Sequence, residues 1–343
     1  MFGKKREELK EQIRLINPMV QNFYLSFKEK ETYLGAIFSE MGVVDSISKT
    51  IEARKIKCFI RANEIRKDLG DERLQGVGWL AAAVLLHNAV VISTLSYAAA
   101  AFINLSKQQE ESLEYTQRKC LVNILDISKT STYKSLLFIL GILPMSTLVK
   151  KLKICFLNSL FHLKESGECL DTIKADHLVG DVRGIIDEVQ EYCKEFELPD
   201  VTEHFVEPDV IKEKIKRKAM GELWQAHIFA KKPPITNIRE DCKSRFYFEL
   251  PKNKAKLMLC YEIGELNFRV NRKNEAKKKY GGTQCLVKGC VEEDSWQHVQ
   301  ECHGYTSRLK KGWGPYDLIN YMVELENERN RKHNRSLINF RSF

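Results

Sequence analysis

Apolar residues recur along most of this chain at the three- and four-residue spacing of amphipathic helices. The first long run follows Asp45, and its apolar positions predict a helix with one core-facing side: Ile47, Ile51, Ile56, Phe59 and Ile60. Basic residues crowd the rest of that run. Farther on, Ser106 with Gln109 three residues later is the pattern of a capping box and predicts a helix start. These patterns predict a mainly α fold.

Breaks in the pattern locate the other elements. Residues 31–42 are rich in strand-forming side chains and contain two glycines, which predicts a short strand. Gly141 and Pro144 interrupt an apolar run and predict two successive helices. Up to about residue 165 we therefore expect a compact helical bundle.

The segment from Gly78 to Ile103 is long enough to span a bilayer. Alanines make up much of it, and His87, Asn88 and several hydroxyl side chains interrupt it. Because alanine contributes little to membrane insertion, we expect a buried helix or helical hairpin and no membrane partner. His87 is then a polar group of the core.

Charge divides the chain into three blocks. Residues 1–164 carry 24 Lys and Arg against 16 Asp and Glu, residues 165–210 carry 3 against 14, and residues 211–343 carry 28 against 16. Two basic blocks around an acidic one indicate separate domains with polyanion binding at both ends. Solvated helix faces without a partner are the alternative. Aromatic residues between the lysines of residues 211–280 suit nucleic acid, or equally the core of that segment.

Residues 285–302 contain the spacing Cys-x4-Cys-x7-His-x3-Cys. Gly289 gives the backbone freedom to direct Cys285 and Cys290 at one ion, and on a helix His298 and Cys302 share a face. Three thiolates and one imidazole are the ligands of a closed structural zinc site. His303 is a rival fourth ligand, and free thiols beside a surface histidine are the alternative.

The motifs of common enzyme active sites are missing. The chain contains no Gly-rich phosphate loop, no Ser/His/Asp motif and no Asp-Asp dipeptide. We therefore expect no catalytic residues and no small-molecule substrate. The ten cysteines follow no disulfide framework and the first residues do not resemble a leader, which favours an intracellular location, in the nucleus or cytoplasm.

The order of several short motifs resembles one protein family. YLG at 33–35 is followed by ARK at 53–55, QRKCLVNIL at 117–125, LGILP at 140–144, the Cys-Cys-His-Cys cluster and a closing helix at 316–329. This order is similar to the region after the polymerase active site in reverse transcriptases of non-LTR retrotransposons. The closest similarity is to the lineage that carries a restriction-like endonuclease.

The resemblance implies a helical thumb-like bundle, a helical connector and a small zinc knuckle. It divides the chain into a palm edge at 1–40, a thumb-like bundle at 41–165, an acidic connector at 166–210, a basic helical segment at 211–280, a knuckle at 281–310, and a C-terminal helix and tail at 311–343.

The partner that the resemblance implies is RNA or DNA, bound by basic residues of the bundle and the basic segment. The expected contacts are Arg54, Lys55, Lys57, Arg61, Lys216, Arg217, Lys218, Arg272, Lys273, Lys277, Lys278 and Lys279. The family's Ala-Asp-Asp signature and its endonuclease pattern are both missing. We therefore expect a nucleic-acid-binding fragment without polymerase activity of its own. The alternative is a domesticated, zinc-stabilised scaffold for protein interactions.

Overall fold

The structure, a computed structural model, confirms a mainly α fold: 74% of the residues that it describes are helical. The described residues are 30–33, 36–39, 41, 43–71, 74–127, 133–162, 170–171, 173–175, 177, 184–229, 246–263, 284–285, 287–293, 298, 302–304 and 324. The statements below concern these residues.

The chain forms two compact units, each built from segments that are distant in sequence. The first unit comprises Met1–Arg61, Asn88–Cys120 and Pro144–Lys218, and the second comprises Ala62–His87, Leu121–Leu143 and Ala219–Phe343. These units differ from the linear division expected from the sequence. Helices α2 (Val43–Asp68), α5 (Lys107–Leu125) and α10 (Pro208–Phe229) contribute residues to both of them.

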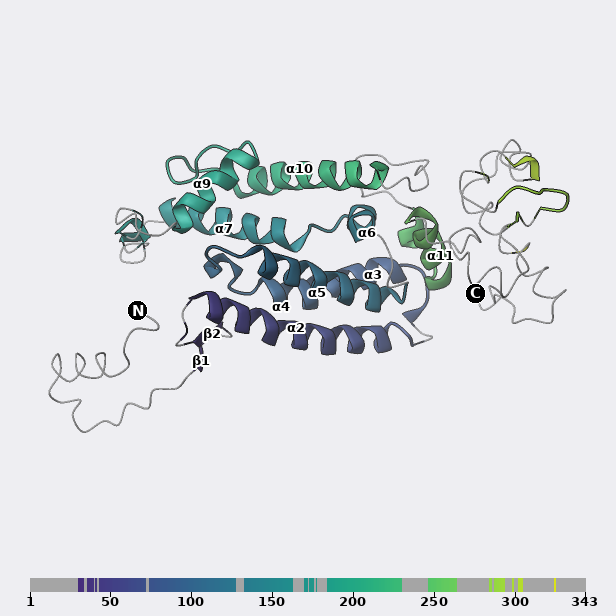
Figure 1. The fold of residues 1–343 in the computed structure, drawn as a ribbon, viewed down its shortest axis with the longest axis horizontal. Helices are drawn as coiled ribbons and strands as arrows, with labels where there is room; N and C mark the ends of the chain where they lie inside the picture. The colour runs from purple at the N-terminus through teal and green to yellow at the C-terminus, as the bar shows by residue number, and fades with distance from the viewer. Residues whose placement is uncertain are drawn as a thin grey trace. The chain divides into compact units, whose positions relative to one another are not determined.

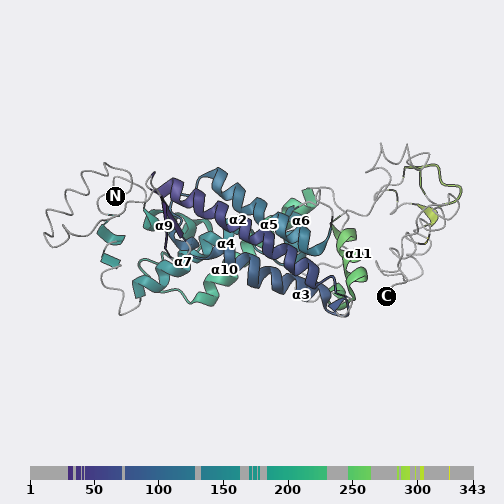
Figure 2. The same ribbon diagram turned by 90° about the horizontal axis from the view of Figure 1, so that it is seen from below.

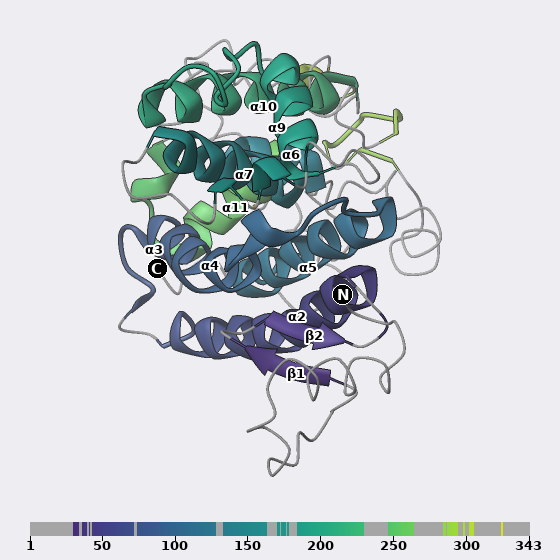
Figure 3. The same ribbon diagram turned by 90° about the vertical axis from the view of Figure 1, so that its left-hand side faces the viewer.

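A β-hairpin stands where the sequence predicted a single strand. Strands β1 (Lys30–Tyr33) and β2 (Ala36–Ser39) pair antiparallel, with Tyr33 opposite Ala36. The hairpin lies beside the start of α2 (Figure 3), where the hydroxyls of Thr50 and Ser46 accept hydrogen bonds from the amides of Ile37 and Ser39 at 2.8 Å each. These two bonds attach the edge of the hairpin to the helix.

The buried face of α2 differs from the predicted one. Ile47 and Ile51 are buried as expected, but Ile56 and Ile60 are 55% and 54% exposed. The buried positions follow a three- and four-residue spacing through Ile47, Ile51, Arg54, Cys58, Ala62 and Ile65. The prediction was wrong for Ile56 and Ile60, because it assigned the stripe from apolar residues alone and placed Arg54 on the surface.

Helix boundaries after residue 100 agree with the local sequence signals. The Ser106 amide donates to the Gln109 side chain at 2.8 Å, and the Gln109 amide donates back to the Ser106 hydroxyl at 3.3 Å, which confirms the capping box. The Gln109 side-chain amide also donates to the Ser48 hydroxyl at 2.9 Å, and α5 runs beside α2 (Figure 1, Figure 2). Gly141 and Pro144 separate α6 (Tyr133–Leu140) from α7 (Met145–His162), as predicted.

The alanine-rich segment is a continuous helix rather than a hairpin. It comprises α3 (Trp79–Leu86), a π-helical stretch η3 (His87–Ile92) and α4 (Ser93–Ser96), and a 3-10 turn η4 (Ala99–Ala101) follows. One face is buried and includes His87, whereas Leu85 on another face is 67% exposed. Among the described residues, Trp79–Ala101 is a stretch long and apolar enough to cross a membrane, with 33% of its most apolar window buried.

The core of the first unit joins α7, α9 (Ile185–Glu195) and α10. Apolar side chains of the three helices form one buried cluster, among them Ile154, Leu157, Ile186, Val189 and Ile211. The stretch expected to be an acidic connector therefore contributes a helix to the core. The acidic residues of α9 itself lie on its less buried faces, except for Glu188, which is buried.

Glu188 forms a buried ion pair with Lys153 of α7. Its carboxylate accepts from the Lys153 ammonium at 2.7 Å and from the Asn104 amide at 2.8 Å. The side chains of Lys153 and Glu188 are 0% and 4% exposed. Because a charge in a core needs a partner, this pair fixes the register of α7 against α9.

The second unit is organised around aromatic side chains. Phe138, Trp224 and His227 lie together, with ring centroids 5.3 to 6.2 Å apart. The indole of the buried Trp79 donates to the Leu69 carbonyl at 3.3 Å. A 3-10 turn, η6 (Phe246–Glu249), and α11 (Lys252–Glu262) contact α3. The aromatic Phe248 of the basic segment is thus half-buried within this unit.

Removing one partner of the buried pair should destabilise the first unit severely. We expect Glu188→Ala to lower the free energy of unfolding by ~3–5 kcal/mol, because the Lys153 ammonium stays buried without its carboxylate. Chemical denaturation measures the change.

The double variant Lys153→Met with Glu188→Leu should recover most of the loss, since no charge is left in the core. Lys212→Ala, which removes the exposed pair with Asp209, is the control and should leave the transition unchanged. An equal loss in the single and double variants would contradict the assigned role.

Candidate functional site

The first half of the cysteine–histidine cluster is a tight turn. The Cys285 amide donates to the Glu292 carbonyl at 2.8 Å, and the Cys290 amide donates to the Val287 carbonyl at 3.0 Å. Gly289 has a backbone φ of +84°, a value that residues other than glycine rarely adopt. The turn therefore brings Cys285 and Cys290 to the same side, as the sequence predicted.

The second half is one helical step. The Cys302 amide donates to the His298 carbonyl at 2.7 Å, the bond of an α-helical turn, so both side chains share a face. The Cys285 and Cys302 sulfurs are 3.9 Å apart, and the Cys290 sulfur lies 3.2 Å from the His298 Nε2. All four ligand atoms lie within 4.8 Å of one another.

This spacing suits a shared ion and excludes a disulfide. Two sulfurs at about 2.3 Å from a tetrahedral zinc are about 3.8 Å apart, close to the separation of Cys285 and Cys302. A disulfide needs about 2.05 Å. The four residues are therefore close enough together to hold a metal ion.

The charge state of the cluster depends on whether a cation is bound. Cys285 and Cys302 are buried, and Cys290 and His298 are half-buried. Burial raises the pKa of the Cys285 thiol to about 12, and the neighbouring Cys302 adds to this effect. A divalent cation reverses that balance, because it stabilises the thiolate form directly.

Two neighbours refine the sequence-based assignment. His303, the rival ligand, is exposed and does not belong to the group of converging ligand atoms. Gly304 was not singled out by its sequence pattern, but a Cβ built there would lie 2.4 Å from a methyl of Val287. A glycine two positions after the last candidate ligand was the available signal. It lets the helical segment approach the turn closely.

Arg54, one of the predicted nucleic-acid contacts, lies in the core and not on the surface. It is 4% exposed, and its guanidinium donates to the carbonyls of Leu95, at 3.3 Å, and Tyr97. It also lies over the rings of Tyr97 and Phe102, 5.7 and 5.1 Å from their centroids. Burial lowers its pKa, yet arginine stays charged at neutral pH. This side chain ties the end of α4 to α2.

The other predicted cations of α2 lie nearer the surface. Lys55 is paired with Glu52 at 2.9 Å and is 25% exposed, whereas Lys57 and Arg61 are exposed and one helical turn apart. Exposed Lys119 of α5 lies over the rings of Phe59 and Tyr115, at 5.8 and 5.0 Å.

The predicted cations of α10 divide in the same way. Lys216 and Arg217 are exposed, and Arg217 lies 3.8 Å from Glu213. Lys218 donates to the Glu195 carbonyl, and Lys214, one turn earlier, donates to the Glu197 carbonyl at 2.6 Å. These two ammonium groups cap the last turn of α9, where backbone carbonyls lack helical partners.

The remaining predicted contacts lie outside the described residues: Arg272, Lys273, Lys277, Lys278 and Lys279.

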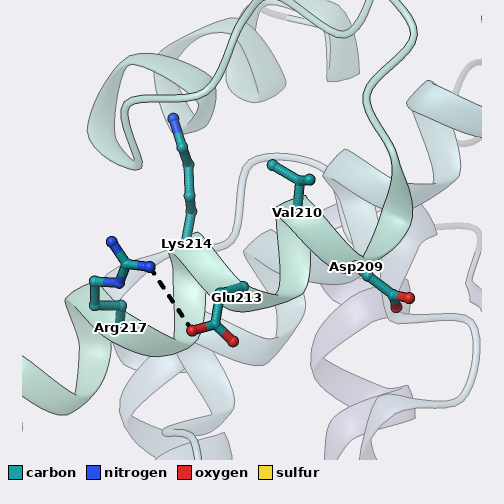
Figure 4. A pocket seen from close by; sticks show the side chains of 5 residues that line it. All are labelled: Asp209, Val210, Glu213, Lys214 and Arg217. Carbon is teal, nitrogen blue, oxygen red and sulfur yellow. Dashed lines mark ion pairs between the residues drawn. The ribbon is translucent and has the colours of Figure 1, made fainter.

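A surface depression on α10 offers no comparable set of ligands. Asp209, Val210, Glu213, Lys214 and Arg217 line it (Figure 4). Its charges are of both signs, Glu213 is directed at Arg217, and Lys214 is engaged with a backbone carbonyl. No group of like chemistry converges there.

No protein-family model matches this chain, and no significant match is found among curated proteins or among solved structures.

The geometry predicts one bound metal ion per chain. Elemental analysis should give a stoichiometry near one, and Co²⁺ should give the absorption of a thiolate-bound tetrahedral ion. Cys285→Ser and Cys302→Ser should abolish both signals, because each removes a buried thiolate.

Cys260→Ser is the matched control, because Cys260 is a half-buried cysteine of α11 outside the cluster. His298→Ala should lower the affinity for the ion and His303→Ala should not. The reverse result would make His303 the ligand, and metal binding unaffected by any cysteine change would refute the site.

Proposed function

We propose that the chain binds RNA or DNA, as the non-catalytic thumb-like and zinc-knuckle part of a reverse transcriptase of the non-LTR retrotransposon type. The order of sequence motifs supports this proposal, and so does a Cys-Cys-His-Cys cluster able to hold a metal ion. The observation that carries it is the exposed surface of α2 and α5 in the first unit, which we call the α2–α5 face.

The α2–α5 face combines positive charge with exposed apolar and aromatic groups. Lys57 and Arg61 form one row along α2, and the exposed Ile56 and Ile60 form the adjacent row at the same spacing. On α5, Tyr115 is 46% exposed and lies under the ammonium of Lys119.

This combination fits a nucleic acid better than a small ligand. Cations along a helix neutralise successive phosphates, and each neutralised phosphate releases counterions. Aromatic and aliphatic groups beside them contact bases or sugars without needing a defined sequence. The α2–α5 face can therefore bind a polyanion along its length.

The ion at the knuckle is proposed to be a structural zinc held by Cys285, Cys290, His298 and Cys302. Three thiolates and an imidazole complete a tetrahedron and leave no open position for a water or substrate. A segment this small buries little apolar surface, so the metal would supply much of its folding energy. Its role would be to hold the neighbouring basic residues in place against nucleic acid.

Binding should depend on salt and on the cations of the α2–α5 face. Lys57→Gln and Arg61→Gln should each weaken the affinity for an oligonucleotide and reduce the slope of log K against log salt by about one. Fluorescence anisotropy over a salt series measures both quantities.

Lys194→Gln, which removes an exposed lysine of α9 outside the α2–α5 face, is the control for nonspecific loss of charge. If the parent chain bound neither RNA nor DNA at about 50 mM salt, the proposed function would be wrong.

The exposed isoleucines favour a second candidate function, a zinc-stabilised scaffold that docks another protein. A pair of exposed branched side chains one turn apart resembles half of a helix–helix interface. The double variant Ile56→Ser with Ile60→Ser separates the two functions. Loss of nuclease-resistant protein partners with intact oligonucleotide binding would favour the scaffold, and loss of oligonucleotide affinity alone would favour nucleic acid.

A further inference from the structure

Helices α2 and α11 bring cations to one exposed carboxylate at the end of α5 in the second unit. Asp126 follows the last residue of α5 and has φ +51°. Its two oxygens accept from Arg66 Nη2, at the end of α2, at 2.6 Å and from Lys256 Nζ, on α11, at 2.8 Å. Arg66 and Asp126 have side chains 50% and 48% exposed, so solvent reaches this cluster.

A third cation, Lys252, stands one helical turn before Lys256 on α11. Its amide donates to the Gln75 carbonyl at 3.0 Å, and its ammonium lies 3.4 Å from the Leu69 carbonyl and 5.7 Å from the centre of the Trp79 ring. These contacts fix Lys252 beside Lys256, although like charges at this spacing repel each other.

The cluster therefore holds more positive charge than its carboxylate neutralises. Burial lowers the pKa of Lys252, and the charges of Lys256 and Arg66 lower it further against the opposing effect of Asp126. Burial acts to raise the pKa of Asp126, but the hydrogen bond from Lys256 and the surrounding cations outweigh it and leave this pKa below its usual value. Three cations around one anion leave a local excess of two positive charges.

An excess of positive charge at fixed positions can bind a second anion. Arg66 offers a planar guanidinium, which matches phosphate oxygens, and the two ammonium groups supply point charges beside it. Asp126 keeps the cations together when no ligand is bound. The amides in the first turn of α11 add partial positive charge on the same side as Lys252.

We propose that Arg66, Lys252 and Lys256 bind a phosphate group, which in a nucleic-acid-binding protein is a phosphate of the RNA or DNA backbone. This assignment of the ligand rests on the proposed function, whereas the phosphate site itself does not. Because the cluster lies on the surface, a polymer can pass across it, and one of its phosphates can share the cations with Asp126.

The test uses the full chain and two probes, inorganic pyrophosphate in a thermal-shift assay and a labelled oligonucleotide over a salt series. The parent chain should gain thermal stability with pyrophosphate. Lys252→Gln and Lys256→Gln should lose most of that gain and flatten the salt slope by about one per lost phosphate contact. Lys134→Gln, an exposed lysine of α6 in the same unit, is the matched control and should behave as the parent chain.

Asp126→Asn keeps the test decisive if a lysine variant folds poorly. It removes the competing carboxylate, so it should tighten pyrophosphate binding several-fold. If Asp126 serves only as a structural clamp, Asp126→Asn would lower the melting temperature and leave pyrophosphate binding no tighter. That result, together with lysine variants that respond as Lys134→Gln does, would overturn the phosphate site.

The two probes also separate this inference from the proposed function. If Lys252→Gln or Lys256→Gln loses the stabilisation by pyrophosphate but keeps its oligonucleotide affinity, the site binds a free phosphate. That result would overturn the assignment to the nucleic-acid backbone and would leave the proposed role of the α2–α5 face intact. A pyrophosphate effect in a chain that binds no oligonucleotide would support the phosphate site and refute the proposed function.

Discussion

The arrangement of the first unit depends on charged side chains that the core encloses. Apolar contacts are less specific than a buried charge pair, because volume-conserving exchanges among leucine and isoleucine usually cost little. The Lys153–Glu188 pair permits one register between α7 and α9, since any shift leaves a buried charge without its partner. Arg54 does the same between α2 and the carbonyls at the end of α4. Asn158 joins α7 to the chain before α10 by bonding the amide and the carbonyl of Val206.

These internal roles change what the positive charge of the sequence means. Several lysines and arginines of the basic blocks are committed to the fold, through buried pairs or by capping the carbonyl end of α9. Among the residues that the structure describes, other cations stay on the surface, including those of the α2–α5 face, of α10 and around Asp126. For binding a polyanion, the positions of the exposed cations therefore matter more than the net charge of +9.

The metal-capable cluster is local in a way that the rest of the fold is not. Its ligands come from residues 285–302, and two short hydrogen-bonded turns bring them together. Such a site can be predicted from the spacing of its ligands. Residues four apart on a helix share a face, and a turn that contains glycine can direct two cysteines at the same point. The contribution that the spacing did not reveal is Gly304, whose missing side chain leaves room for Val287.

The helical class, the capping box at Ser106, the break between α6 and α7, and the cluster able to hold a metal ion could all be predicted from the sequence. Each of these depends on residues within a few positions of one another. Three features follow from helix packing and could not be predicted locally: Arg54 is buried while Ile56 and Ile60 are exposed, the acidic stretch supplies a core helix, and Arg66 and Lys256 both pair with Asp126. The face of a helix that becomes buried depends on the helices packed against it, and those partners come from segments distant in the chain.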